Sequence, residues 1–258
     1  MKERKLRYYV IFLLLFVYIV LMFIFFLYPN FKDKHNNTSI IVNKDAKWYY
    51  KDGKWKDMTR TNQYNWKKFK IYQNNNYLGN YYLLYNDKWY IFDKDRNPIE
   101  QDGIDIFAIN TNQKYKYGNF DLEDVSATDE KYVRKVLEDN NIIAMDFTTK
   151  NVVNFDLDSD GKKEKIFIVS NVFTSDSPKY IFNFVFVVKN SKITFIKKDI
   201  NTYDNMYNMC QAYLAYMVDL TGDGIYEIIT GCGYYSDKKQ CVEMYQLKKN
   251  KYVKVKSC

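Results

Sequence analysis

Residues 155–167 read FDLDSDGKKEKIF, and this stretch determines the fold that we expect for the C-terminal half of the chain. Acidic side chains occupy alternate positions of a short loop, a glycine supplies the turn, and apolar residues flank the loop on both sides. Ca²⁺ takes six to eight oxygen ligands, and alternate positions of such a loop can converge on one point. The predicted ligands are the side chains at loop positions 1, 3, 5 and 9 and the backbone carbonyl at position 7: Asp156, Asp158, Asp160, Glu164 and Lys162.

The flanks of this loop indicate strands and not helices. A helix-loop-helix calcium site requires a bidentate Glu at position 12, and this position is Phe167. Runs of Val, Ile and Phe before and after the loop favour strands. We therefore predict a strand-loop-strand site. A metal-free turn is the alternative, because Asp side chains also accept hydrogen bonds from their own backbone. Repulsion among four neighbouring carboxylates favours the site that holds a cation.

The loop recurs 63 positions later, where residues 218–229 read VDLTGDGIYEII. In both copies an apolar run, a Lys-Asn turn and a second short strand follow the loop. A shared loop, hairpin and spacing indicate an internal repeat. The second copy therefore predicts a second calcium site, which Thr221 weakens because it replaces a carboxylate. Its expected ligands are Asp219, Thr221, Asp223 and Glu227.

These two segments, DLDSDGKKE at 156–164 and DLTGDGIYE at 219–227, resemble the loops of the FG-GAP/VCBS repeat family. The resemblance covers about residues 150–256. It implies extracellular β repeats that bind calcium between adjacent strands, through the acidic residues of each loop. Two repeats cannot close a propeller of several blades. A propeller-like ring and an open β domain are therefore the two alternatives for this region.

The rest of the chain favours strands with a single helix, so the expected fold class is mainly β (α+β). Aromatic strand-like runs separated by turns predict a small antiparallel β unit. An apolar stripe after Ser126 or Thr128, either of which can cap it, predicts a helix that ends near residues 140–141. The expected division is a cytoplasmic tip and membrane anchor at 1–31, a polar tether at 32–46, the β unit at 47–125 and the helix with the repeat domain at 126–258.

An uncharged apolar segment lies near the N-terminus, over about residues 8–28. About 20 apolar residues in a helix span a bilayer, and the four basic residues before this segment place the N-terminus in the cytoplasm. We therefore expect a single-pass membrane protein whose C-terminal domain lies outside. A cleaved signal peptide, the alternative, has a shorter apolar region and a small-residue cleavage site.

All four cysteines lie in the last fifth of the chain. An even number in an exported domain suggests disulfides, and four cysteines allow three pairings. We expect Cys232 with Cys241, which flank a turn-rich segment, and therefore Cys210 with Cys258. The alternative is that all four stay reduced.

Charge and histidine content restrict the function. The net charge is +8, and it is +5 once residues 1–31 are set aside; scattered basic residues argue against a nucleic-acid partner. His35 is the single histidine, which excludes His-assisted nucleophiles and most zinc hydrolases. We expect a calcium-stabilised cell-surface binding or adhesion protein that is not an enzyme, with a wall polymer or another protein as ligand. A surface hydrolase that uses carboxylates and an accessory subunit of a membrane complex are the alternatives.

Overall fold

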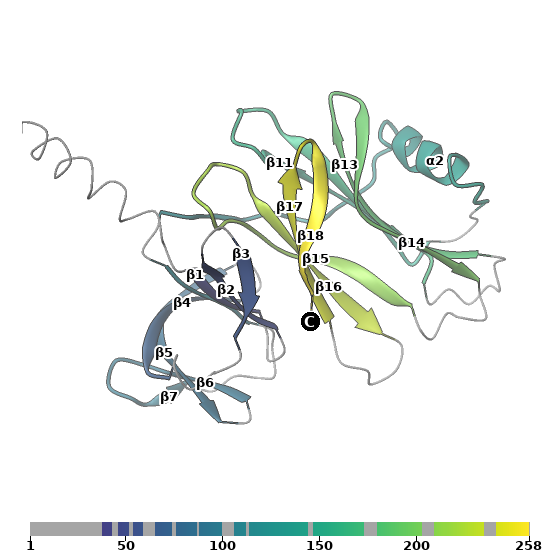
Figure 1. Cartoon of the computed structure of the whole chain (residues 1–258). Helices are drawn as coiled ribbons and strands as arrows, with labels where there is room; N and C mark the ends of the chain where they lie inside the picture. The colour runs from purple at the N-terminus through teal and green to yellow at the C-terminus, as the bar shows by residue number, and fades with distance from the viewer. Residues whose placement is uncertain are drawn as a thin grey trace, which may run out of the picture.

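The structure is a computed structural model, which describes residues 38–42, 46–51, 54–58, 65–73, 76–86, 88–99, 106–111, 114–143, 147–172, 180–202, 209–234 and 241–257. Within these ranges the chain forms three antiparallel sheets and one helix (Figure 1). The β-rich part of the expected fold class therefore fits the structure.

The first sheet comprises eight described strands in the order β3-β2-β1-β8-β4-β5-β6-β7. Strands in it alternate apolar and polar residues, so that one face of the strand is buried. In β4, for example, Phe69 and Ile71 are buried and the lysines between and before them are exposed. The strands are β1 (Thr38–Val42), β2 (Ala46–Lys51), β3 (Lys54–Asp57), β4 (Lys67–Gln73), β5 (Asn76–Asn86), β6 (Lys88–Phe92), β7 (Pro98–Ile99) and β8 (Ile106–Asn110).

Two five-stranded sheets formed by the described residues 116–257 repeat one arrangement, with orders β10-β11-β12-β13-β14 and β9-β15-β16-β17-β18. Each contains a short edge strand, two strands joined by an acidic loop, and a hairpin. The sequence repeat is therefore a structural repeat. The strands are β9 (Lys116–Gly118), β10 (Glu123–Asp124), β11 (Thr149–Phe155), β12 (Glu164–Ser170), β13 (Tyr180–Lys189), β14 (Lys192–Thr202), β15 (Cys210–Asp219), β16 (Glu227–Tyr234), β17 (Cys241–Lys248) and β18 (Lys251–Ser257).

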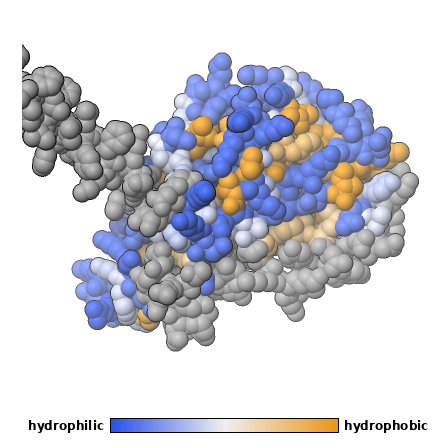
Figure 2. Space-filling model, in the orientation of Figure 1, coloured by the Kyte–Doolittle hydropathy of each residue, from blue (hydrophilic) through white to orange (hydrophobic). Residues whose placement is uncertain are grey.

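The three sheets and the helix are stacked as layers, with the β15–β18 sheet inside. One buried cluster joins this sheet to the first sheet and includes Trp48, Phe107 and Met244. A second cluster on its other face joins it to the β11–β14 sheet and includes Ile166 and Ile228. Apolar burial on both faces stabilises the stack at roughly 25 cal/mol per Å² removed from water. Figure 1 shows the same order, with β1–β7 on one side of β15–β18 and helix α2 on the other. On the face in Figure 2, hydrophobic residues form separate groups among hydrophilic ones.

Helix α2 (Glu130–Glu138) confirms the expected helix and its apolar stripe. Val133, Val136 and Leu137 are buried against the outer face of the β11–β14 sheet. The predicted cap is wrong, because the N-cap residue is Asp129 and it makes no side-chain cap hydrogen bond. Its carboxylate instead accepts hydrogen bonds from Lys165 Nζ at 2.7 Å, which fixes the start of the helix to β12.

The polar tether expected at residues 32–46 is interrupted by a strand. Strand β1 is buried at all five positions and pairs with both β2 and β8, so it lies inside the first sheet. The expected β unit at 47–125 is also too long, since β9 pairs with β15 and β10 pairs with β11. The segments at 116–118 and 123–124 therefore belong to the repeat sheets.

The transmembrane helix in the expected fold class requires a correction. Among the residues that the structure describes, no helix is long and apolar enough to cross a membrane. Helix α2 has nine residues, whereas about 20 apolar residues are needed to span a bilayer. The described fold is therefore β-rich with one short helix, and the segment at 8–28 lies outside the described residues.

The disulfide between Cys210 and Cys232 shows that the expected pairing is wrong. Cys232 lies opposite Cys241 in the register of β16 and β17, but it bonds to the cysteine on its other neighbour, β15. Cys241 is also disulfide-bonded, and no described cysteine is free. The expectation of disulfides is therefore confirmed, while the choice of partners is not.

Candidate metal centre

The first loop connects β11 to β12, and its backbone is held by its own carboxylates. Asp156 accepts hydrogen bonds from the backbone N–H of Asp160 at 3.1 Å and of Gly161 at 3.0 Å. Glu164 accepts one from the N–H of Leu157 at 2.8 Å. Gly161 has a φ of +84°, a conformation that glycine adopts without steric cost. The loop is therefore fixed at both ends, at positions 1 and 9.

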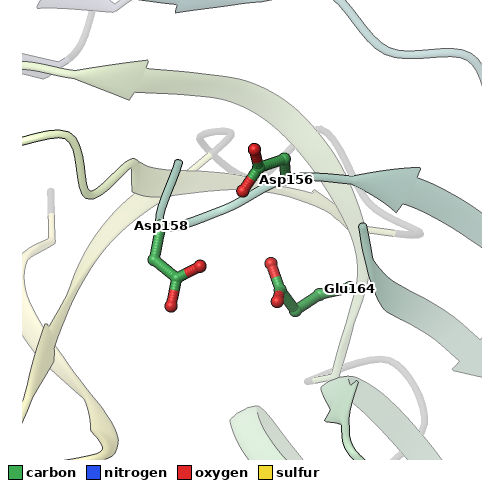
Figure 3. A group of neighbouring side chains, drawn as sticks. All are labelled: Asp156, Asp158 and Glu164. Atoms are coloured by element: carbon green, nitrogen blue, oxygen red, sulfur yellow. The ribbon is translucent and has the colours of Figure 1, made fainter. Parts of the chain in front are cut away.

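Three of the predicted ligands come together in this loop. Asp156, Asp158 and Glu164 each offer an oxygen, and these oxygens lie within 4.8 Å of one another; Figure 3 shows the three side chains. Glu164 is buried, with 3 % of its surface exposed. Oδ1 of Asp158 is buried and has no hydrogen-bond partner among the described residues. An all-oxygen donor set with one unsatisfied buried acceptor fits a hard cation such as Ca²⁺.

The other two predicted ligands are placed differently. Asp160 is not a member of the three-carboxylate group. Oδ1 of Asp160 accepts a hydrogen bond from the backbone N–H of Lys162 at 2.8 Å. This recorded contact of Lys162 is made by its N–H group and not by the carbonyl that was predicted as a ligand. The hydrogen bond from Lys189 is the main cause that lowers the pKa of the Asp160 carboxyl, and the Lys162 N–H adds to it.

Sequence reasoning missed Lys189, the last residue of β13, which brings an ammonium group into this loop. Its Nζ lies 2.9 Å from Oδ2 of Asp160 and 3.0 Å from Oε1 of Glu164, and it also pairs with Oδ2 of Asp158. Burial alone lowers the pKa of Lys189, but these carboxylates outweigh it and raise the pKa well above its ordinary value. The Lys-Asn turn that follows the apolar run in both copies was the available signal, but sequence spacing does not show that this turn lies beside the loop.

The second loop connects β15 to β16 with nearly the same hydrogen bonds. Asp219 accepts hydrogen bonds from the N–H groups of Gly222 at 2.7 Å, Asp223 at 3.2 Å and Gly224 at 3.0 Å. Glu227 accepts one from the N–H of Leu220 at 2.7 Å, as Glu164 does from Leu157. The two loops are therefore one structural motif used twice.

The electrostatics of the second loop differ from those of the first. Burial, followed by the neighbouring charges of Asp223 and Asp219, raises the pKa of Glu227 to about 7, although hydrogen bonds from Leu220 and Gln246 act against this. No described lysine or arginine forms an ion pair with these carboxylates. The Oγ1 of Thr221 is buried and has no hydrogen-bond partner within the described chain.

The two loops lie against each other between the repeat sheets. Ser159 Oγ donates a hydrogen bond to the carbonyl of Gly224 at 2.8 Å, and the N–H of Tyr226 donates to the carbonyl of Leu157 at 2.9 Å. Phe155 packs edge-to-face on the ring of Tyr226, with centroids 4.8 Å apart. The two loops are therefore in direct contact through backbone, hydroxyl and ring groups.

Comparison of the chain with protein-family models, with curated proteins and with solved structures finds no match. The resemblance to FG-GAP/VCBS repeats therefore rests on the loop residues and stays a prediction.

Proposed function

We propose that this chain is a cell-surface binding or adhesion module, that Ca²⁺ at its repeat loops stabilises the β sheets, and that it has no catalytic activity of its own. The observation that carries this proposal is the pair of matching acidic loops packed against each other between two sheets. A cation held there would join two strands of a repeat and reduce repulsion among the loop carboxylates. The residues that would hold it in the first loop are Asp156, Asp158 and Glu164.

The location proposed for this module is the outer side of the cell membrane. Disulfides form and persist in oxidising compartments, and the Cys210–Cys232 bridge is in keeping with such a location. Millimolar calcium outside the cell also suits loops that use side-chain and backbone oxygens, because extracellular calcium modules bind in the range of about 10⁻⁴ to 10⁻³ M. The resemblance to FG-GAP/VCBS repeats points in the same direction.

The first sheet supplies a surface suited to ligand binding. Trp66 is 42 % exposed, lies 5.0 Å from the ring of Phe92 and carries the guanidinium of Arg96 at 5.1 Å. Its φ of +60° is unusual for a bulky residue, and such backbone strain is concentrated at functional sites. Trp48 is not part of this surface, since it is buried in the core. An aromatic ring beside a cation, on a domain of net positive charge, suits an anionic wall polymer.

Sedimentation of the full chain with insoluble cell-wall polymer tests this function. We expect the parent to sediment with the polymer, more strongly with calcium than with EGTA, and Trp66→Ala to bind at least about fivefold more weakly. Leu122→Ala is the control, because Leu122 is 54 % exposed on another part of the chain. Equal binding by the parent and the Trp66 variant would remove this surface from the proposal, and no binding by the parent would exclude the wall-polymer ligand.

A further inference from the structure

The side chain of Lys189 occupies the charged centre of the first loop. Its ammonium pairs with Asp158, Asp160 and Glu164, which are three of the four carboxylates of that loop. The pairs with Asp158 and Asp160 are partly exposed. The side chain of Glu164 is only 3 % exposed, so bulk water does not solvate its charge. One positive charge of the chain itself therefore holds the position that the proposed calcium ion requires.

In the second repeat no described lysine takes the place that Lys189 has in the first loop. Lys248 is the counterpart of Lys189, since each is the last paired residue before the hairpin turn, opposite Lys251 and Lys192 respectively. Lys248 is exposed. In the second loop the neutral amide Nε2 of Gln246 donates to Oε1 of Glu227 at 3.0 Å. The buried Glu therefore pairs with a neutral amide, from Gln246, in the second repeat and with the ammonium of Lys189 in the first.

We propose that Lys189 is an intramolecular competitor of calcium, which keeps the first loop in its folded geometry without metal and lowers the affinity of that loop for Ca²⁺. This inference rests on the proposed function, because it concerns regulation of the same loop. A tethered ammonium is present at high effective concentration, so calcium has to displace it before Asp158, Asp160 and Glu164 are available. Two loops of nearly identical hydrogen bonding therefore differ in calcium affinity for a reason that lies outside the loop sequence, on the neighbouring hairpin.

Titration of the full chain with CaCl₂ by calorimetry tests the competition, with Lys189→Gln as the principal variant. Gln removes the charge and keeps a donor, as Gln246 does in the second repeat. We expect this variant to bind calcium at the first loop about tenfold more tightly than the parent, the change that corresponds to ~1.4 kcal/mol. Adding Asp158→Asn should abolish the gain. Lys248→Gln is the matched control and should leave the affinity unchanged, and Lys189→Arg should keep the parent value because it keeps the charge.

The outcomes separate this inference from the proposed function. If the parent and Lys189→Gln bind calcium equally at the first loop, Lys189 does not compete and the inference fails, while the proposed function stands. If only Lys189→Gln binds calcium, the inference stands and the parent does not use the metal. If neither binds, both are wrong. Thermal unfolding in EGTA gives a second readout, because removal of the internal cation should lower the midpoint of Lys189→Gln and not that of Lys248→Gln.

Discussion

Glu243 on β17 is the centre of an ionic network between the two repeat sheets, and its removal should cost much of the stability of the domain. Oε2 of Glu243 accepts hydrogen bonds from Lys197 Nζ on β14 at 2.6 Å and from the hydroxyl of Tyr245 at 2.8 Å. Oε1 accepts one from Lys254 Nζ at 2.8 Å. The side chains of Lys197 and Glu243 are only 10 % and 11 % exposed. Glu243→Gln would therefore leave a buried ammonium without its main counter-charge.

The magnitude follows from the pKa of Glu243. Burial raises this pKa, but the hydrogen bonds from Lys197, Lys254 and Tyr245 outweigh burial and lower it from 4.5 to about 2. A shift of one pKa unit corresponds to about 1.4 kcal/mol, so folding stabilises the charged form of Glu243 by about 3 kcal/mol relative to its protonated form. Breaking a buried ion pair by removing one partner costs a similar amount, about 3–5 kcal/mol. We expect Glu243→Gln to lower the free energy of unfolding by about 3 kcal/mol at pH 7.

Urea unfolding from pH 7 to pH 2 gives both the size and the sign. Because the folded pKa of Glu243 is lowered, its contribution is complete above about pH 4.5 and is lost as the pH falls toward about 2. The difference between parent and variant should therefore be largest at neutral pH and should shrink across that range. Asp139→Asn is the control, since its pair with Lys135 is exposed and worth less than about 0.5 kcal/mol. A loss below about 1 kcal/mol at pH 7, or a difference independent of pH, would refute the argument.

Replacing both Cys210 and Cys232 by Ser should lower the free energy of unfolding in urea by about 3 kcal/mol, because their bond closes a chain segment with a sequence separation of 22; a loss under about 1 kcal/mol would contradict this. Gly118→Ala should cost about 1–3 kcal/mol in the same assay, because the new Cβ would lie 2.5 Å from Cζ of the Phe155 ring. Gly233→Ala, whose Cβ would meet nothing closer than 3.8 Å, is its control, and equal costs for the two would show that the clash is relieved.

The repeat and its loops could be predicted because their information is local. Positions 1 and 9 of each loop, such as Asp156 and Glu164, accept hydrogen bonds from backbone N–H groups of the same loop, so the turn itself follows from local spacing. Helix α2 was predictable for the same reason, since its stripe has the period of a helix facing a core. Strand β1 was missed because it is short, is buried on both faces and lies within a polar stretch, so it shows no alternation.

The remaining features depend on which strands are neighbours, which one sequence does not show. Cys232 has a cysteine near it on β15 and another on β17, and only the position of the strands selects Cys210. Lys189 reaches the first loop because β13 pairs with β12 and ends beside that loop. Position along the chain gives no sign of this contact, so the sequence suggested a stronger metal site in the first loop than in the second.

Thermal unfolding of the full chain, in millimolar CaCl₂ and in EGTA, tests most directly whether calcium stabilises the repeats. A ligand at roughly ten times its Kd adds about 1.4 kcal/mol, which raises the midpoint by a few degrees. We expect such a rise with calcium in the parent, and no rise in a variant that carries Asp158→Asn and Asp223→Asn together. An equal midpoint with calcium and with EGTA in the parent would contradict it, because the loops would then be turns held by their own hydrogen bonds and by Lys189.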